Sequence, residues 1–230
     1  MEFTVTYLSN SGFLQEIGKT LLIFDYTCDC PQFVNETLFP KFDRVVFFVS
    51  HSHYDHFSPD IFAFSRLSNV DYALSYDVYA PCGVKMNPGE TIKLNGISVS
   101  AFGSTDLGVS FLVETDGIRV FHAGDLNFWH WKTQSSPFEV MQMRRLFTGI
   151  LDTLPGRFDA AFFPVDPRLE RDYDEGAQIF LDRFAPRALF PMHFREAVWA
   201  PLAFAEKNKG GNTRVFPLTR SGQKQTVILP

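Results

Sequence analysis

Cysteine, positive charge and long apolar runs are all scarce in this sequence. Its three cysteines are an odd number and too few for a disulfide framework. The net charge of -5 argues against a nucleic-acid partner held by bulk electrostatics. No apolar stretch reaches the roughly 18 residues of a membrane span, and the N-terminus lacks the features of a secretory signal. We therefore expect a cytoplasmic protein with reduced thiols, no nucleic-acid partner and no membrane association.

Large aromatic side chains are abundant instead. The 230 residues include 26 phenylalanines, and 45% of the chain is hydrophobic. This composition is typical of an ordered protein whose core is filled with aromatic rings. Because the sequence contains no repeat, low-complexity segment or long linker, we expect one domain over residues 1–230.

Short runs with β-strand character dominate the first half of the chain, and helical patterns enter later. The expected strands are 4–8, 12–17, 20–25, 44–49, 70–75, 91–94, 97–102, 109–114, 118–122, 160–164, 188–192, 214–216 and 226–229. The expected helices are 59–67, 137–152, 174–184 and 202–207. In the helix at 137–152, the expected apolar stripe consists of Phe138, Met141, Leu146, Ile150 and Leu151. This order of elements favours two sheets packed on each other with helices outside, a four-layer α/β sandwich.

The segment HSHYDH at positions 51–56 holds three of the six histidines and directly follows the apolar strand at 44–49. Loops at strand ends are places where side chains converge on a ligand. This spacing can present imidazoles and a carboxylate to two points about 3.5–4 Å apart, as in a two-metal hydrolytic site. Nitrogen and oxygen ligands without an obligatory thiolate suit zinc, and also manganese or iron.

Two other strand ends carry side chains that can complete such a site. Asp125 lies just past the strand at 118–122, and Gly124 before it allows close approach of the backbone. His193 ends the strand at 188–192. A lone histidine at a strand end is more often a packed residue, and His122 inside its strand is expected to be structural. Together with positions 51–56, however, Asp125 and His193 form a constellation.

The set HxHxDH, a strand ending in Gly-Asp and a strand ending in His resembles the metallo-β-lactamase superfamily of metal-dependent hydrolases. The resemblance covers nearly the whole chain. The segments similar to the first hairpin, the central hairpin and the last two core strands of that family are YLSNSGFLQEIGKTLLIFDY, GVSFLVETDGIRVFHAGD, FDAAFFPVD and ALFPMHF. In its compact size the chain is similar to the branch that includes ascorbate-6-phosphate lactonase. The resemblance implies an αββα sandwich of two mixed β-sheets with helices outside.

The resemblance also implies a set of metal ligands and a reaction. One or two Zn²⁺ ions, with Mn²⁺ or Fe²⁺ as alternatives, would serve hydrolysis of an ester, lactone, amide or phosphodiester bond in a small-molecule substrate. Asp55 would both bind metal and orient the nucleophilic water. By position, the ligands are His51 and His53 for the first metal, Asp55, His56 and His193 for the second, and Asp125 as the bridge.

The chain departs from the family pattern at the first metal. The family has one more histidine in the loop before the central hairpin, and that loop here reads AFGSTDLG at 101–108. Ser104 is the positional match, but a neutral hydroxyl is a poor zinc ligand. Asp106 is either a carboxylate ligand, which favours harder metals such as manganese, or a turn-forming residue beside Gly108. The weakened first site leaves open a second hypothesis, a non-catalytic family member that acts as a metal- or ligand-binding sensor or scaffold.

Further candidates surround the expected metal centre. Trp129 and Trp131 bracket His130 and either wall a substrate pocket or pack beneath a loop. In the first case His130 replaces the missing ligand or donates a proton. Arg168 follows the strand at 160–164 and is either a recognition site for an anionic group or a solvated loop arginine. Tyr54, inside the metal loop, is a candidate hydrogen-bond donor to substrate.

Overall fold

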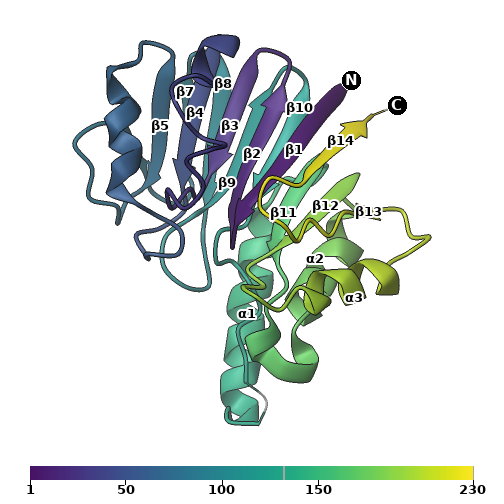
Figure 1. Ribbon diagram of the computed structural model, residues 1–230. Coiled ribbons are helices and arrows are strands. Elements are labelled where there is room, and N and C mark those ends of the chain that lie inside the picture. The colour runs from purple at the N-terminus through teal and green to yellow at the C-terminus, as the bar shows by residue number, and fades with distance from the viewer. Residues whose placement is uncertain (132, 230) are drawn as a thin grey trace.

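The computed structural model describes residues 1–131 and 133–229, which form two sheets packed face to face (Figure 1). The first sheet contains β1 (Glu2–Ser9), β2 (Gly12–Ile17), β3 (Thr20–Phe24), β4 (Arg44–Val49), β5 (Val70–Ser75), β6 (Val84–Met86) and β14 (Lys224–Ile228). The second contains β7 (Thr91–Leu94), β8 (Ile97–Phe102), β9 (Ser110–Thr115), β10 (Ile118–His122), β11 (Ala160–Pro164), β12 (Ala188–Met192) and β13 (Arg214–Val215). Their strand orders are β14-β1-β2-β3-β4-β5-β6 and β13-β12-β11-β10-β9-β8-β7.

Both sheets are mixed. In the first sheet β1, β2 and β3 are antiparallel, whereas β3, β4 and β5 are parallel. In the second sheet β8, β9 and β10 are antiparallel, whereas β10, β11 and β12 are parallel. The prediction of two mixed sheets in an α/β sandwich is therefore confirmed. The short edge strand β6 was not predicted.

Helices cover the outside of the sandwich. The α-helices are α1 (Pro137–Thr153), α2 (Glu175–Phe184) and α3 (Trp199–Lys207), and the 3₁₀ segments are η1 (Phe39–Lys41), η2 (Pro59–Arg66) and η3 (Pro167–Asp172). Figure 1 shows α1, α2 and α3 grouped on the side of β11 and β12, away from β5. The segment expected as a helix at 59–67 has Ser58 as its N-cap but is 3₁₀ rather than α. Among the described residues, no helix is both long and apolar enough to cross a membrane.

Aromatic rings join the two sheets, as the composition predicted. Phe13 of β2 and Phe162 of β11 have ring centroids 4.6 Å apart. Phe48 of β4 meets Phe111 of β9 edge to face, with centroids 5.5 Å apart. All four rings are buried. Burial of each such side chain contributes about 1.5–3 kcal/mol, and tilted or edge-to-face ring pairs add further stabilisation.

The apolar stripe expected on the helix at 137–152 is wrong in part. Phe138, Met141 and Leu146 are 60%, 40% and 49% exposed. The buried positions of α1 are Phe147 and Leu151, one turn apart. The helix has apolar residues on more than one face and can bury only one of them against the sheet. Packing of the Phe147 ring against β11 selects that face.

The parallel strands bring five loops to one edge of the sandwich. The carboxyl ends of β3 and β4 lie together in one sheet, and those of β10, β11 and β12 lie together in the other. Ligand sites of α/β proteins commonly form at such strand ends. The loops at this edge begin with Asp25, Ser50, Ala123, Val165 and His193.

Candidate metal centre

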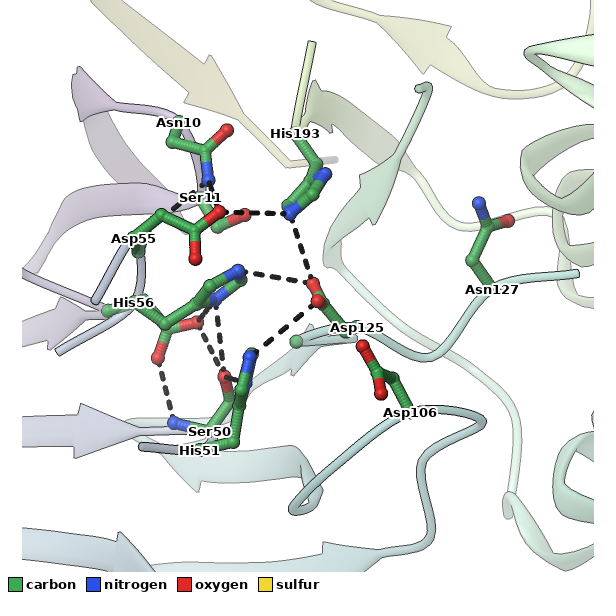
Figure 2. Close-up of polar contacts among 12 residues, drawn as sticks. Asn10, Ser11, Ser50, His51, Asp55, His56, Asp106, Asp125, Asn127 and His193 are labelled. Atoms are coloured by element: carbon green, nitrogen blue, oxygen red, sulfur yellow. Dashed lines mark hydrogen bonds and ion pairs between the residues drawn. The ribbon is translucent and has the colours of Figure 1, made fainter. Parts of the chain in front are cut away.

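Three of the histidines expected as metal ligands, His51, His56 and His193, converge on Asp125 (Figure 2). Nε2 of His56 and Nε2 of His193 lie 3.2 and 3.3 Å from Oδ1 of Asp125. Nε2 of His51 lies 3.6 Å from Oδ2 of the same carboxylate. Three loops, after β4, β10 and β12, thus place three imidazoles around one buried carboxylate.

The ligand atoms form two groups, each with ligand atoms within 4.8 Å of one another. The members of the first group are His51, His53 and Asp125, and those of the second are Asp55, His56 and His193. Because Oδ1 of Asp125 also faces the second group, its carboxylate lies between the two. The structure thereby brings together all six residues that the family resemblance assigned to metal, in the same two sets.

Four atoms at the centre are buried and, within residues 1–131 and 133–229, have no hydrogen-bond partner. They are Nε2 of His51, His56 and His193, and Oδ1 of Asp125. An unsatisfied buried polar atom costs about 1–3 kcal/mol, so four that face one another need a common partner. Divalent cations at the two ligand groups would satisfy all of them, and nitrogen and carboxylate oxygen are ligands that zinc prefers. The residues present therefore fit a metal.

The charges in the protein alone lead to the same conclusion. Burial raises the pKa of the Asp125 carboxyl, but the positive charges of the nearby histidines lower it below its usual value. Burial lowers the pKa of His56, yet Asp125 and then Asp25 raise it well above the usual value for histidine. Both shifts have the same cause, because the buried carboxylates favour positive charge at this centre. A metal ion would supply that charge in place of a proton.

A carboxylate at the end of β3 fixes the histidines that follow β4. Nδ1 of His56 donates to Oδ2 of Asp25 at 2.8 Å. Ser50 donates to the same carboxylate through its backbone N–H at 2.8 Å and through its hydroxyl at 2.7 Å. Nδ1 of His51 in turn donates to the Ser50 oxygen at 3.0 Å. With their protons held on Nδ1, both imidazoles direct a bare Nε2 at the centre.

A second carboxylate fixes the remaining histidine. Nδ1 of His193 donates to Oδ2 of Asp166, at 2.8 Å. Arg168 donates to the same carboxylate through Nε at 2.9 Å and Nη2 at 2.5 Å. Burial raises the pKa of Asp166, but the hydrogen bonds from His193 and Arg168 lower it to about 2. Asp166 therefore stays ionised and holds the tautomer of His193 that exposes Nε2.

Two glycines permit the close packing of the metal loop. A Cβ on Gly108 would lie 2.1 Å from the carbonyl oxygen of Ser50 and 2.5 Å from Cβ of His51. A Cβ on Gly124 would lie 2.7 Å from Cβ of Ser50. Both have positive φ. The interpretation of Gly124 as a point of close backbone approach agrees with this geometry, and Gly108 serves the same purpose.

A pocket of about 470 Å³ opens over the metal ligands. Besides those ligands, its lining includes Ser52, Tyr54, Asp106, Arg168 and Arg195. The side chain of Tyr54 is 82% exposed. The backbone N–H of Asp106 donates to Oγ of Ser104 at 3.3 Å, which is a turn contact. Asp106 shares the pocket with Asp125 but belongs to neither ligand group, so both readings of this residue remain predictions.

The two tryptophans and the histidine between them lie in different surroundings. Trp129 is buried, and its indole N–H donates to the carbonyl oxygen of Asp125 at 2.8 Å. Its ring packs edge to face against His193. His130 lies instead beside α2, with Nε2 3.1 Å from Oε2 of Glu175, and does not line the pocket. The structure therefore does not bring His130 to the ligands, and it makes Trp129 a support beneath them. His122 is structural, as expected: Nε2 donates to the Ser11 carbonyl, and Nδ1 accepts from a backbone N–H.

Sequence reasoning missed three residues at this site: Asp166, Arg195 and Asn10. Asp166 follows an apolar strand just as Asp125 does, so the strand-end rule applied to β11 would have found it. Arg195 and Asn10 carry no local signal. Nδ2 of Asn10 donates to Oδ2 of Asp55 at 3.3 Å, and the carbonyl of Asn10 accepts from the backbone N–H of His193.

Comparison with known sequences finds similarity to metal-dependent hydrolases. No protein-family model matches the chain. A UPF0173 metal-dependent hydrolase from Pyrococcus abyssi is 24% identical over 217 residues, which cover 86% of this chain and 87% of that protein. A UPF0173 metal-dependent hydrolase from Korarchaeum cryptofilum is 31% identical over 137 residues, 55% of this chain and 61% of that protein.

Solved structures share the fold. A metallo hydrolase from Ignicoccus hospitalis superposes with a TM-score of 0.71 at 18% identity, covering 100% of both chains. The metallo-β-lactamase fold protein YhfI from Bacillus subtilis gives a TM-score of 0.62 at 15% identity and covers 98% of this chain and 99% of that one. The diiron β-hydroxylase CmlA from Streptomyces venezuelae gives 0.63 at 14% identity, covering 99% of this chain and 54% of that one. The chain therefore has the metallo-β-lactamase fold, as its motifs predicted.

Proposed function

We propose that the protein is a metal-dependent hydrolase that cleaves an ester, lactone, amide or phosphodiester bond in a small molecule. The arrangement of three unpartnered buried imidazole nitrogens around the Asp125 carboxylate carries this proposal. The names of its sequence relatives, metal-dependent hydrolases, support it. The pocket volume of about 470 Å³ lies within the range of small-molecule sites.

The ligand groups would hold one or two metal ions, and the second group is the more completely built. Zinc suits the nitrogen and oxygen donors, and Mn²⁺ and Fe²⁺ are the alternatives. A diiron protein shares the fold, so the fold does not select the metal. When bound there, the metal supplies Lewis acidity toward the substrate oxygen and lowers the pKa of a water molecule towards neutrality.

The residues of the chain then position the reactants. Oδ2 of Asp55 lies 3.7 Å from Nε2 of His193 and accepts a hydrogen bond from Asn10, so this partly buried carboxylate is held where it can take a proton from the attacking water. The exposed Tyr54 hydroxyl can donate to substrate at the pocket wall. Arg168 offers a guanidinium that Asp166 already orients.

One observation favours a second candidate, a metal-binding sensor or scaffold without turnover. The loop at 101–108 has no histidine, and the first ligand group therefore consists of two histidines and Asp125 only. So small a ligand set at the first group is what we would expect of a protein that binds a single metal at the second group and responds by changing conformation.

Elemental analysis and an activity panel separate the two candidates. The protein is purified without chelator, its metal content is measured, and it is assayed on nitrophenyl esters, a lactone and bis-(p-nitrophenyl) phosphate. The hydrolase predicts at least one metal per chain and turnover that His56→Ala abolishes together with one equivalent of metal. Asp152→Asn, an exposed change on α1, is the control. Metal without turnover on any substrate favours the sensor, and no metal uptake overturns both.

A further inference from the structure

Two arginines flank His193 at the metal pocket, and one of them, Arg195, has no part in the chemistry described above. Nη2 of Arg195 lies 3.6 Å from Oδ2 of Asp55. Nη2 of Arg168 lies 3.4 Å from Nδ1 of His193. Both side chains line the same pocket as Asp125, and they are 45% and 43% exposed. Two cationic groups therefore face the space above the metal ligands.

The backbone at Arg195 is in an unfavourable conformation. Its φ is +52°, in the left-handed region that glycine adopts readily and other residues rarely. His193, two residues earlier, has φ of +61°, and there the strain serves a metal ligand. At residue 195 no ligand role explains it. Strained positions in folded proteins cluster at functional sites, so the side chain of Arg195 is itself a candidate for function.

The two guanidinium groups have donors to spare. Arg168 is fixed by Asp166 through Nε and Nη2, and its guanidinium carbon lies 5.5 Å from the ring centre of Trp129. These contacts leave Nη1 for another acceptor. Across residues 1–131 and 133–229, the side chain of Arg195 makes no hydrogen bond, and its separation from Asp55 is longer than a hydrogen bond.

The balance of charge in the pocket also requires an explanation. Three carboxylates line it, on Asp55, Asp106 and Asp125, against the two arginines. Asp25 and Asp166 lie directly behind the ligand histidines, so with neutral histidines these groups leave three net negative charges, which two divalent cations turn into one net positive charge. A metal-loaded pocket of this kind attracts anions, whereas a pocket without the arginines would not.

We propose that Arg168 and Arg195 together bind an oxyanion group of the substrate, a phosphate or a carboxylate, beside the metal centre. Arginine suits this role because its planar fork of donors matches the oxygens of either group. The proposal rests on the proposed function, since it names the substrate class of the same site. The substrate of the hydrolase is then an anionic small molecule, and Arg195 is a residue that sets this specificity.

Anion binding by the zinc-loaded protein tests the proposal without any turnover. Inorganic phosphate and acetate are titrated separately by calorimetry into wild type, Arg195→Gln and Arg183→Gln, after zinc content has been matched by elemental analysis. Arg183 is the control because its side chain is 40% exposed and pairs with Asp152, at the end of α2 far from the strand ends that carry the ligands. Arg195→Gln should weaken binding of the preferred anion about tenfold to a hundredfold, with no change in Arg183→Gln.

If Arg195→Gln weakens the binding of phosphate, the substrate carries a phosphate group. If it weakens the binding of acetate instead, the substrate carries a carboxylate. Arg195→Lys keeps the charge without the fork, so it should restore only part of the affinity, and it is the test if the glutamine variant loses zinc. Equal affinity in wild type and both variants of Arg195 overturns the proposal, as does zinc-loaded wild type that binds neither anion. If anion binding depends on Arg195 but no substrate is hydrolysed, the hydrolase proposal fails and the anion site stands.

Discussion

The buried carboxylate of Asp166 gives the sharpest test of how this metal centre is built. Asp166→Asn replaces one carboxylate oxygen by an amide nitrogen at almost constant volume. The change removes the negative charge that accepts Nδ1–H of His193 at 2.8 Å and two donors of Arg168 at 2.9 and 2.5 Å. His193 must keep its proton on Nδ1 to direct a bare Nε2 at Asp125, and an amide nitrogen facing Nδ1 favours the opposite tautomer.

The expected loss follows from these contacts. Removal of a group that orients a ligand histidine commonly costs ten- to a hundredfold in metal affinity. Here the loss should lie near the upper end, about 2–3 kcal/mol, because Arg168 also loses its counter-charge and its positive charge then opposes the cation. The pKa of Asp166, about 2, means that the carboxylate is ionised throughout the neutral range, so the effect should not vary between pH 6 and 8 through this group.

Competition for Zn²⁺ against a chromophoric chelator measures this affinity, with unfolding of the metal-free proteins as the check on the fold. Asp159→Asn is the matched control, because Asp159 precedes β11 at its opposite end and pairs there with Arg187. It should leave the affinity unchanged. Affinity of Asp166→Asn within about threefold of wild type would refute the assignment of Asp166 as the group that orients His193. An equal loss in both variants would mean general destabilisation instead.

Three further predictions concern stability. Gln15 is buried between the sheets, and neither atom of its amide has a partner in the described part of the chain, so Gln15→Met should raise the free energy of unfolding in urea by about 1–2 kcal/mol. Arg195→Gly should relieve backbone strain and raise the free energy of unfolding by about 1 kcal/mol. Arg183→Gly, inside α2, should lower the free energy of unfolding by about 1 kcal/mol. A destabilising effect of Arg195→Gly would contradict the strain argument. Slight burial raises the pKa of Asp116, but hydrogen bonds from two threonines and Arg44 lower this pKa below its usual value. The ionised carboxylate therefore contributes its full stabilisation above the unfolded-state pKa of about 3.9, and this contribution is lost as the pH falls through the folded-state pKa. Wild type should therefore exceed Asp116→Asn in stability at pH 7, and urea titrations at decreasing pH should show that difference shrink rather than grow.

The strands were predictable because their patterns are local. The bounds of β2, β4 and β10 agree residue by residue with those expected at 12–17, 44–49 and 118–122. β6 was missed because three residues at a sheet edge, two of them exposed, leave no alternation to detect. The stripe on α1 was misjudged for a different reason. Leu146 and Phe147 are adjacent apolar residues on different faces, and only the position of the sheet decides which is buried.

The convergence of the candidate metal ligands was predictable because each lies in a loop after an apolar strand, and the fold brings such strand ends together. The groups that orient them were harder to find. Asp166 and the candidate ligand His193 follow neighbouring parallel strands, β11 and β12, which are separated by a helix in the sequence. Their spacing in the sequence therefore does not predict their hydrogen bond. The proposal for Arg195 was prompted by its backbone φ, which is a property of the folded chain and cannot be read from the residue type.

The contacts behind the ligands show why the two halves of the centre differ. In the second group, His56 and His193 each donate Nδ1–H to a buried carboxylate, which raises the basicity of Nε2 toward a metal. In the first group, His51 donates to the neutral hydroxyl of Ser50, and His53 is exposed. The loop that would add a third histidine contributes Ser104 and Asp106 instead. The missing histidine is therefore not the only feature that weakens the first group, because its two histidines are also less firmly oriented. A centre of this kind should hold one metal tightly in the second group and a second metal more weakly in the first.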